Sequence, residues 1–280
     1  MSSNTRWGAI ALCSLSLFAS SCGGGGNDGT NAADTTQMPA APREITTSEV
    51  PASPEFNDAK LVITSVATEK QGKDSAKVNF TFSVSNYELK SQTSDAEGKQ
   101  CNNSAQGQHI HFILDNKPYV ALYEPKHTAT VALNSEHYVL VFLSRSYHES
   151  LKNKGAAMVY HFKIDKDGKL QEMENPKTPM VFYSRPKGDY LGKDTANVLF
   201  DFYVWNAELG TDYKVKAEVK SGKLKKEMEI AEWKPQFLHN LDMGKSSIKL
   251  TLIDKNGKSV DGPMTSVTRD FTLAADEPIK

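Results

Sequence analysis

The chain has 280 residues, and its 33 Lys and Arg nearly balance its 34 Asp and Glu, which gives a formal net charge of −1. This balance excludes a strong global field that would attract nucleic acid. Charged residues make up 24% of the chain and apolar residues 39%, with a mean hydropathy of −0.49. These values exclude a transmembrane bundle and a chain that is disordered throughout.

The first 22 residues are typical of a bacterial export signal. Arg6 supplies a positive charge, and the 13 residues from Trp7 to Ala19 are mostly apolar, fewer than the ~20 that a bilayer-spanning helix needs. Small residues then precede Cys22 as in a lipobox, although Ala19 stands where Leu is usual. We expect 1–22 to be a lipoprotein signal peptide with Cys22 as its lipid anchor. An ordinary secretory signal is the alternative.

Residues 23–54 are predicted to be a disordered linker. The segment begins with four glycines and continues with Ala, Thr, Pro and Ser, a composition that buries little apolar surface. The lipid would hold the protein in the cell envelope, on the periplasmic face or the outer surface of the outer membrane. After cleavage at Cys22, Cys101 would be the only cysteine left, so no intrachain disulfide is expected.

An internal repeat divides the rest of the chain. Residues 72–89 read GKDSAKVNFTFSVSNYEL, residues 192–209 read GKDTANVLFDFYVWNAEL, and 11 of the 18 positions are identical. The spacing of the copies far exceeds the 20–50 residues of a solenoid unit. Each copy is therefore predicted to be a whole domain, at 55–171 and at 176–280.

Both copies show the two-residue period of β-strands. Val78, Phe80, Phe82 and Val84 alternate with polar residues, which indicates a strand with one buried face. Further strands are predicted at 61–66, 109–114, 137–143, 158–164, 180–183, 198–204, 213–219, 226–230, 247–253 and 266–273. The pattern predicts an all-β protein with two duplicated immunoglobulin-like β-sandwich domains. A small Greek-key barrel is the competing arrangement.

The histidines belong almost entirely to the first copy. Six of the seven lie between residues 109 and 161. His109 and His111 stand where the second copy has Lys214 and Lys216. Similarly, His137 aligns with Ser246, and the His148 region has no histidine counterpart. The shared fold therefore does not require these histidines.

This asymmetry predicts a metal site in the first domain. His109 and His111 are two apart on a strand, so both imidazoles project from one sheet face, where they would suit Cu or Zn. His137, His148 and Cys101 are candidates to complete the ligand set. The alternative is that these residues are only polar groups on a half-exposed sheet.

Other functions have weaker support. Cys101 with His109 would make a thiol nucleophile, but nothing in the polar insertion around Cys101 indicates an activated thiolate. Ser146 and His148 lack a G-x-S-x-G elbow, so we expect no enzyme. A metal-independent module that docks a peptide, glycan or protein through Arg145 and Tyr147 is the main alternative to a metal site.

Several longer motifs carry a family resemblance. They are GQHIHFILDNKPYVALYE at 107–124, HYVLVFLSRSYHESLK at 137–152, PKGDY at 186–190 and DMGKSSIKLTLID at 242–254. Together they resemble a family of Bacteroidota envelope lipoproteins that often bear the label "phosphopeptide-binding protein". That label implies a forkhead-associated domain, whose phosphate-binding signature is not found here. The resemblance implies an envelope lipoprotein and no particular activity, so the overall expectation is a non-catalytic binding module.

Overall fold

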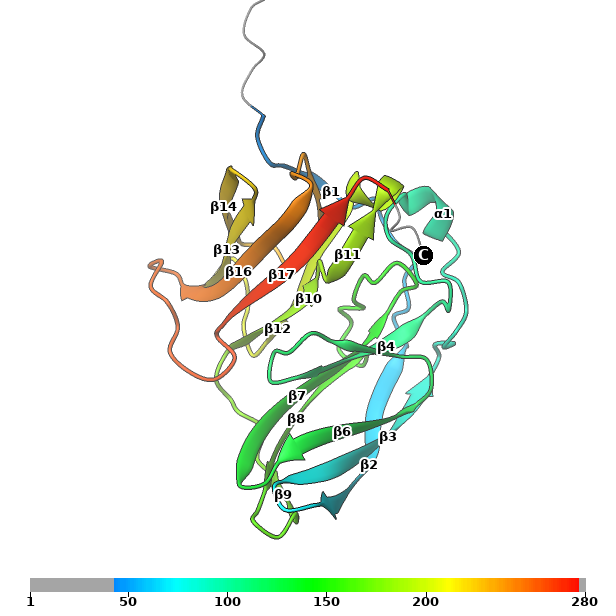
Figure 1. Cartoon of the computed structure of the whole chain (residues 1–280), viewed down its shortest axis with the longest axis vertical. Coiled ribbons are helices and arrows are strands. Elements are labelled where there is room, and N and C mark those ends of the chain that lie inside the picture. The colour runs from blue at the N-terminus through cyan, green and yellow to red at the C-terminus, as the bar shows by residue number, and fades with distance from the viewer. Residues whose placement is uncertain (1–42, 277–280) are drawn as a thin grey trace, which may run out of the picture. The chain divides into compact units, whose positions relative to one another are not determined.

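The computed structural model of the chain describes residues 43–276 (Figure 1). The predicted signal peptide, the predicted anchor at Cys22 and the linker up to residue 42 lie outside the described residues. The described residues belong to one compact unit. Within them, no helix is long and apolar enough to cross a bilayer.

The first sandwich packs a three-stranded sheet against a five-stranded sheet. The smaller sheet has the order β2-β3-β6, with β2 at Lys60–Gln71, β3 at Ser75–Ser85 and β6 at Lys126–Ala132. The larger sheet has the order β5-β4-β7-β8-β9, at Val120–Leu122, His109–Leu114, Ser135–Ser144, Ala157–Ile164 and Leu170–Met173. The core between them includes Phe80, Phe112 and Phe162. A short helix, α1 at Ala96–Lys99, lies in the insertion before β4.

The second sandwich also consists of two sheets. One has the order β1-β15-β12-β10, at Thr46–Glu49, Gln236–His239, Val198–Trp205 and Met180–Arg185. The other has the order β11-β17-β16-β13-β14, at Gly188–Leu191, Ser266–Ala274, Gly244–Asp254, Tyr213–Ser221 and Leu224–Ile230. A 3-10 helix, η1, spans Gly192–Thr195. The core includes Phe200, Phe202 and Leu250.

The two sandwiches share one topology. In chain order, β2 to β8 of the first correspond to β10 and β12 to β17 of the second, with matching neighbours in both sheets. β1, β9 and β11 are additions at sheet edges. This confirms the predicted all-β fold with two immunoglobulin-like sandwiches. The Greek-key barrel is wrong, because each copy has two separate sheets.

The strand register shows the duplication residue by residue. In the turn after β7, the Arg145 amide donates to the carbonyl of Glu149; in the turn after β16, the Asp254 amide donates to the carbonyl of Lys258. Leu151 and Val260 likewise donate to matching carbonyls on β7 and β16. Both copies thus close this hairpin in the same way.

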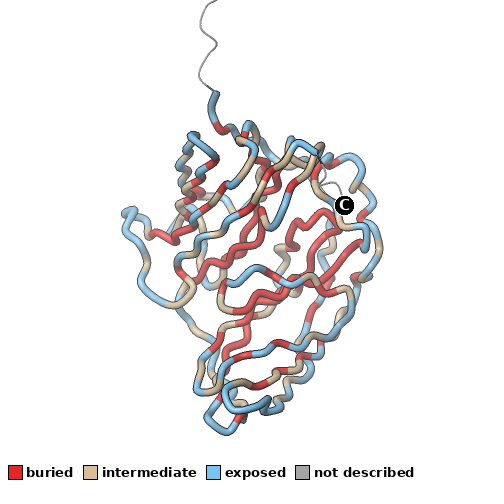
Figure 2. Tube along the Cα trace, viewed as in Figure 1, coloured by how far each residue is buried: buried red, intermediate tan, exposed pale blue. Residues whose placement is uncertain are grey.

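The central strands of the five-stranded sheet in the first sandwich are covered on both faces. One face forms the first core, and the other packs on β10 and β12 through residues such as Leu140 and Phe142 against Phe182 and Tyr203. Every residue of β4 and of β10 is buried, as Figure 2 shows along these strands. The half-exposed sheet face, which was the alternative to a site, is therefore wrong.

The predicted linker ends earlier than expected. Thr46–Glu49 forms β1, which pairs antiparallel with β15, and Ile45 is buried in the second core. Ile45, Thr46 and Thr47 have β-branched side chains, which favour a strand, and β1 forms the edge of its sheet. The linker prediction is therefore wrong for residues 43–54.

The last strand of the first sandwich ends at Met173 and β10 begins at Met180, on either side of the predicted junction.

Candidate metal centre

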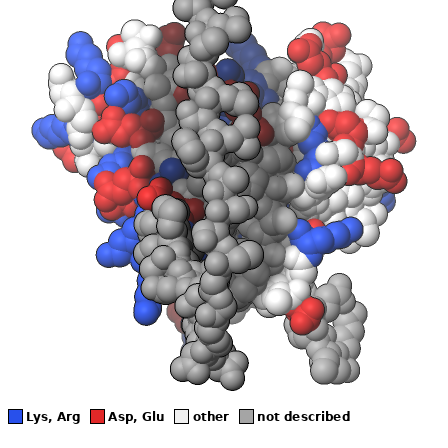
Figure 3. Space-filling model, turned by 90° about the horizontal axis from the view of Figure 1, so that it is seen from above, with Lys and Arg blue, Asp and Glu red and all other residues white. Residues whose placement is uncertain are grey.

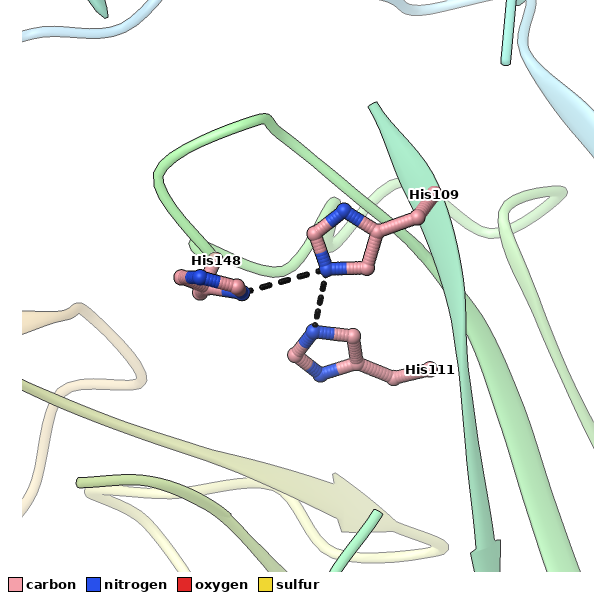
Figure 4. A group of neighbouring side chains, drawn as sticks. All are labelled: His109, His111 and His148. Atoms are coloured by element: carbon pink, nitrogen blue, oxygen red, sulfur yellow. Dashed lines mark hydrogen bonds between the residues drawn. The ribbon is translucent and has the colours of Figure 1, made fainter. Parts of the chain in front are cut away.

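Strand β4 places two imidazoles on the face that meets the second sandwich. Ile110 and Phe112 point into the first core, so the alternation of the strand turns His109 and His111 the other way. Neither has any exposed surface. Figure 4 shows both rings projecting from β4 toward the same point. The sequence prediction that they share a face is confirmed.

A third imidazole comes from the turn after β7. His148 has a left-handed backbone with φ +69°, and its amide donates to the Arg145 carbonyl. The matching residue of the second copy is Gly257, whose amide makes the same bond and whose φ is +78°. Glycine adopts this conformation freely, whereas other residues lose stability there. A histidine at a position where the other copy has glycine is a candidate for a functional role.

The ring nitrogens of these three residues converge. His109 Nε2 lies 2.9 Å from His111 Nε2 and 3.1 Å from His148 Nδ1, as the dashed lines of Figure 4 mark. All three nitrogens lie within 4.8 Å of one another. Imidazole nitrogens bind Zn at ~2.0–2.1 Å, so small ring movements let one ion contact all three.

The remaining ring nitrogens have partners that fix the rings. His109 Nδ1 donates to the Gly107 carbonyl at 2.8 Å, which leaves Nε2 of the neutral ring with a free lone pair. His111 Nδ1 lies 3.2 Å from the Ser184 hydroxyl, on β10. Such outer partners orient metal-binding histidines in known sites.

The residue that supplies one of these partners, Gly107, must remain glycine. Its φ is +81°, and a Cβ would lie 2.5 Å from the Lys90 carbonyl oxygen.

Burial keeps the imidazoles neutral. It lowers the pKa of His109 to about 4, and it lowers the pKa of His111 and of His148 well below the usual value. The positive charges of Arg185 and Lys187 lower all three values further. Three neutral rings with converging nitrogens can hold a metal ion.

His137 does not join this group. It lies on the opposite face of β7, because it has the same parity as Val139, which points into the first core. Its Nδ1 lies 2.7 Å from Asp115 Oδ2, and its Nε2 lies 2.6 Å from the Ser135 hydroxyl. The prediction of His137 as a metal ligand is therefore corrected.

Cys101 is also separate from the imidazoles. It is a free, buried thiol packed with Tyr147, Leu199 and Phe237. Burial raises the pKa of the Cys101 thiol to about 12, so it is neither an activated nucleophile nor a ready thiolate ligand. Among residues 43–276, no Cys, Asp or Glu belongs to the group formed by the three histidines.

The residues predicted for metal-independent docking do not form a surface. Arg145 Nη1 donates to Glu149 Oε1 at 3.0 Å, and Nη2 donates to the Pro54 carbonyl at 2.6 Å. Tyr147 is fully buried. Both side chains are used inside the fold, so their assignment to ligand binding is corrected.

Three neighbours of the site were not predicted. Tyr119 stacks on His111 with ring centroids 3.6 Å apart, and its hydroxyl lies 3.3 Å from His148 Nδ1. Ser184 and Arg185 come from β10, in the other sandwich. The continuous apolar run at 139–143 could have indicated that β7 is covered on both faces. Nothing in the sequence shows which strand covers it.

The exterior shows no large region of one charge in the view of Figure 3. Lys and Arg alternate with Asp and Glu over the visible described residues, in keeping with the net charge of −1.

Comparisons with known proteins give remote likenesses only. No protein-family model matches the sequence, and no curated protein does. The fibronectin(III)-like modules of Clostridium thermocellum CbhA are 13% identical over 76% of this chain and 93% of theirs, with a TM-score of 0.26. The FN1–FN3 domains of chicken CNTN1 are 11% identical over 77% of this chain and 67% of theirs, with a TM-score of 0.25. The fold therefore rests on this chain's own sheet order and register.

Proposed function

We propose that this chain is a non-catalytic metal-binding module of a cell-envelope lipoprotein, and that His109, His111 and His148 hold one Cu or Zn ion. The observation that carries the proposal is the convergence of three imidazole nitrogens, on residues at most 8% exposed, within 4.8 Å of one another. The glycine at the matching turn position of the second copy supports it, because a left-handed turn position favours glycine when no side chain is needed there.

The enclosure of the site supports binding rather than catalysis. A catalytic metal keeps a position open for water or substrate. Here His109 and His111 are fully buried, and Tyr119 covers one side of the His111 ring. The rigid frame of two packed sandwiches would hold the ligand nitrogens in place.

Metal analysis tests the proposal directly. The chain is purified without a His tag, with Cys13 and Cys22 replaced by Ser so that Cys101 is the only thiol. We expect one equivalent of Cu or Zn by mass spectrometry, and an increase in Tm that depends on metal concentration. His111→Gln should abolish both. His137→Gln, on the other face of the sheet, should change neither. If the protein with all three histidines intact binds no metal, the proposed metal-binding function is wrong.

The lipid anchor is tested separately. We propose that Cys22 is acylated and places the module at a membrane. Cells given a labelled fatty acid should label the full chain, and Cys22→Ser should remove the label and release the protein from the membrane fraction. Cys13→Ser is the matched control. Equal membrane retention of Cys22→Ser and the unchanged chain would contradict the anchor.

A further inference from the structure

Two cationic side chains, Arg185 and Lys187, act electrostatically on all three imidazoles. Arg185 is 3% exposed and its Nη1 donates to the Tyr119 hydroxyl at 3.1 Å. That hydroxyl lies 3.3 Å from His148 Nδ1. The Lys187 Nζ lies 4.3 Å from the centroid of the Tyr119 ring, on which the His111 ring also stacks. One tyrosine therefore separates two cations from two of the converging rings.

Among the described residues, no carboxylate pairs directly with the buried guanidinium of Arg185; Asp194 is linked to it only through Asn102, whose amide donates to Asp194 at 2.7 Å. The guanidinium donates to neutral oxygens, on the Tyr119 hydroxyl, the Asn102 side chain and the Lys187 main chain. Its Nε is buried and has no partner among the described residues. The buried carboxylates of this region are engaged elsewhere, Glu149 with Arg145 and Asp201 with Lys152.

This charge distribution discriminates between ions by their valence. The donors of the site are three neutral nitrogens, so they cancel none of the charge of an ion. The repulsion from a fixed cation is proportional to the charge of the ion and grows where water is excluded. The repulsion between the fixed cations and a divalent ion is therefore about twice that for a monovalent ion. Structural Zn sites are also almost always four-coordinate, and the described chain gives this group three members.

We infer that the site binds copper as Cu(I) in preference to divalent zinc, an inference that rests on the proposed metal-binding function. Cu(I) carries one positive charge and has a filled d shell that is satisfied by two or three ligands. The buried group of His109, His111 and His148 offers such a set, beside Arg185 and Lys187.

The experiment compares the two ions in the same protein. Cu(I) affinity is measured without oxygen by competition with a colorimetric Cu(I) chelator, and Zn(II) affinity by competition with a zinc indicator. The purified chain carries Ser at positions 13, 22 and 101, so that no thiol binds copper. We expect one Cu(I), three nitrogen neighbours in the copper X-ray absorption spectrum, and Zn(II) bound more weakly.

Removal of one charge gives the sharper result. Lys187→Met should improve both affinities, but the Zn(II) affinity more, because the change in binding free energy scales with ion charge. A gain of about threefold for Cu(I) would correspond to about tenfold for Zn(II). Lys225→Met, an exposed lysine at the far sheet edge, is the control and should change neither.

The possible outcomes separate the two proposals. If neither ion binds, both the metal-binding function and this inference fail. If Zn(II) binds as tightly as Cu(I), or if Lys187→Met changes both affinities by the same factor, the metal site stands and the preference for Cu(I) is overturned.

Discussion

At the scale of single residues, position 148 separates fold from function. The second copy has Gly257 at this turn with the same hydrogen bond and a similar φ. A left-handed conformation costs a residue with a Cβ about 1–2 kcal/mol. The backbone of His148 makes the turn bond as Gly257 does, and the turn needs no imidazole. A ring at this position therefore points to a role in the site rather than in the turn.

His148→Asn should therefore keep the fold and lose the metal. Asn tolerates the left-handed region better than most residues, but its short amide cannot replace the imidazole beside His109. We expect metal affinity to fall at least ~100-fold, by analogy with the strong effects of site substitutions, while circular dichroism stays unchanged. Retained affinity would exclude His148 as a ligand.

The metal-free protein should lose stability in mild acid. The pKa of His109 is about 4 in the folded chain against 6.5 for the free side chain, so between these values the unfolded chain binds a proton that the folded chain does not. The free energy of unfolding therefore falls as the pH falls from 6.5 to 4, by on the order of 3 kcal/mol for His109 alone. Above pH 6.5, His109 is neutral in both the folded and the unfolded chain, so it no longer lowers the free energy of unfolding.

Urea unfolding with EDTA at several pH values measures this effect. A variant with His109→Gln and His111→Gln should show a flatter pH profile in this window, because the buried imidazoles that resist protonation are gone. The control is His239→Gln, a partly exposed histidine on β15, outside the site. Parallel profiles for the double variant and the unchanged protein would contradict the assignment.

At the scale of elements, the sequence predicted which side chains share a sheet face, but not which strand covers that face. The alternation of His109 with Ile110 placed both imidazoles on one face, as observed. The same rule places His137 on the face of Val139, so its exclusion from the site follows from β7 alone. What the sequence lacks is the identity of the covering strand, since β10 and its Ser184 belong to the other copy. The position of β1 was also hidden, because four residues in a polar segment form too short a pattern.

Strand β1 should contribute measurably to the second sandwich. Ile45, next to β1, is 3% exposed and packs in the second core, so Ile45→Ala should lower the free energy of unfolding by about 2–4 kcal/mol. Val62→Ala, at a residue that is 45% exposed, should change it by less than about 0.5 kcal/mol. Chemical denaturation measures both. Equal effects would mean that β1 is not part of the folded core.

At the scale of the whole molecule, the repeat predicted two sandwiches but not their packing. The interface combines Phe142 of the first sandwich with Phe182 and Tyr203 of the second, and hydrogen bonds such as that of the Asn116 side chain to Val181 cross it. An apolar interface of this kind opposes independent domain motion. The three converging histidines lie against it, so some of their neighbours, such as Ser184 and Arg185, come from the other copy.

The two sandwiches should therefore unfold together. Calorimetry of the metal-free chain should show one transition whose calorimetric and van't Hoff enthalpies agree. Phe182→Ala, which removes a fully buried ring from the interface, should lower the stability by about 3–5 kcal/mol and separate the transition into two. Two transitions in the unchanged protein would show that the sandwiches are independent.

If Cys22 carries a lipid, the position of β1 limits how far the two sandwiches can lie from the membrane. The 20 residues from Gly23 to Pro42 would then connect the anchor to the described residues. A fully extended chain of that length spans at most ~70 Å. A linker that continued to Pro54 would add ~40 Å. Pairing of β1 with the second sandwich would thus shorten the tether to the anchor. If the histidine site holds a metal, any soluble donor or acceptor of that metal would have to meet the protein within that distance of the bilayer.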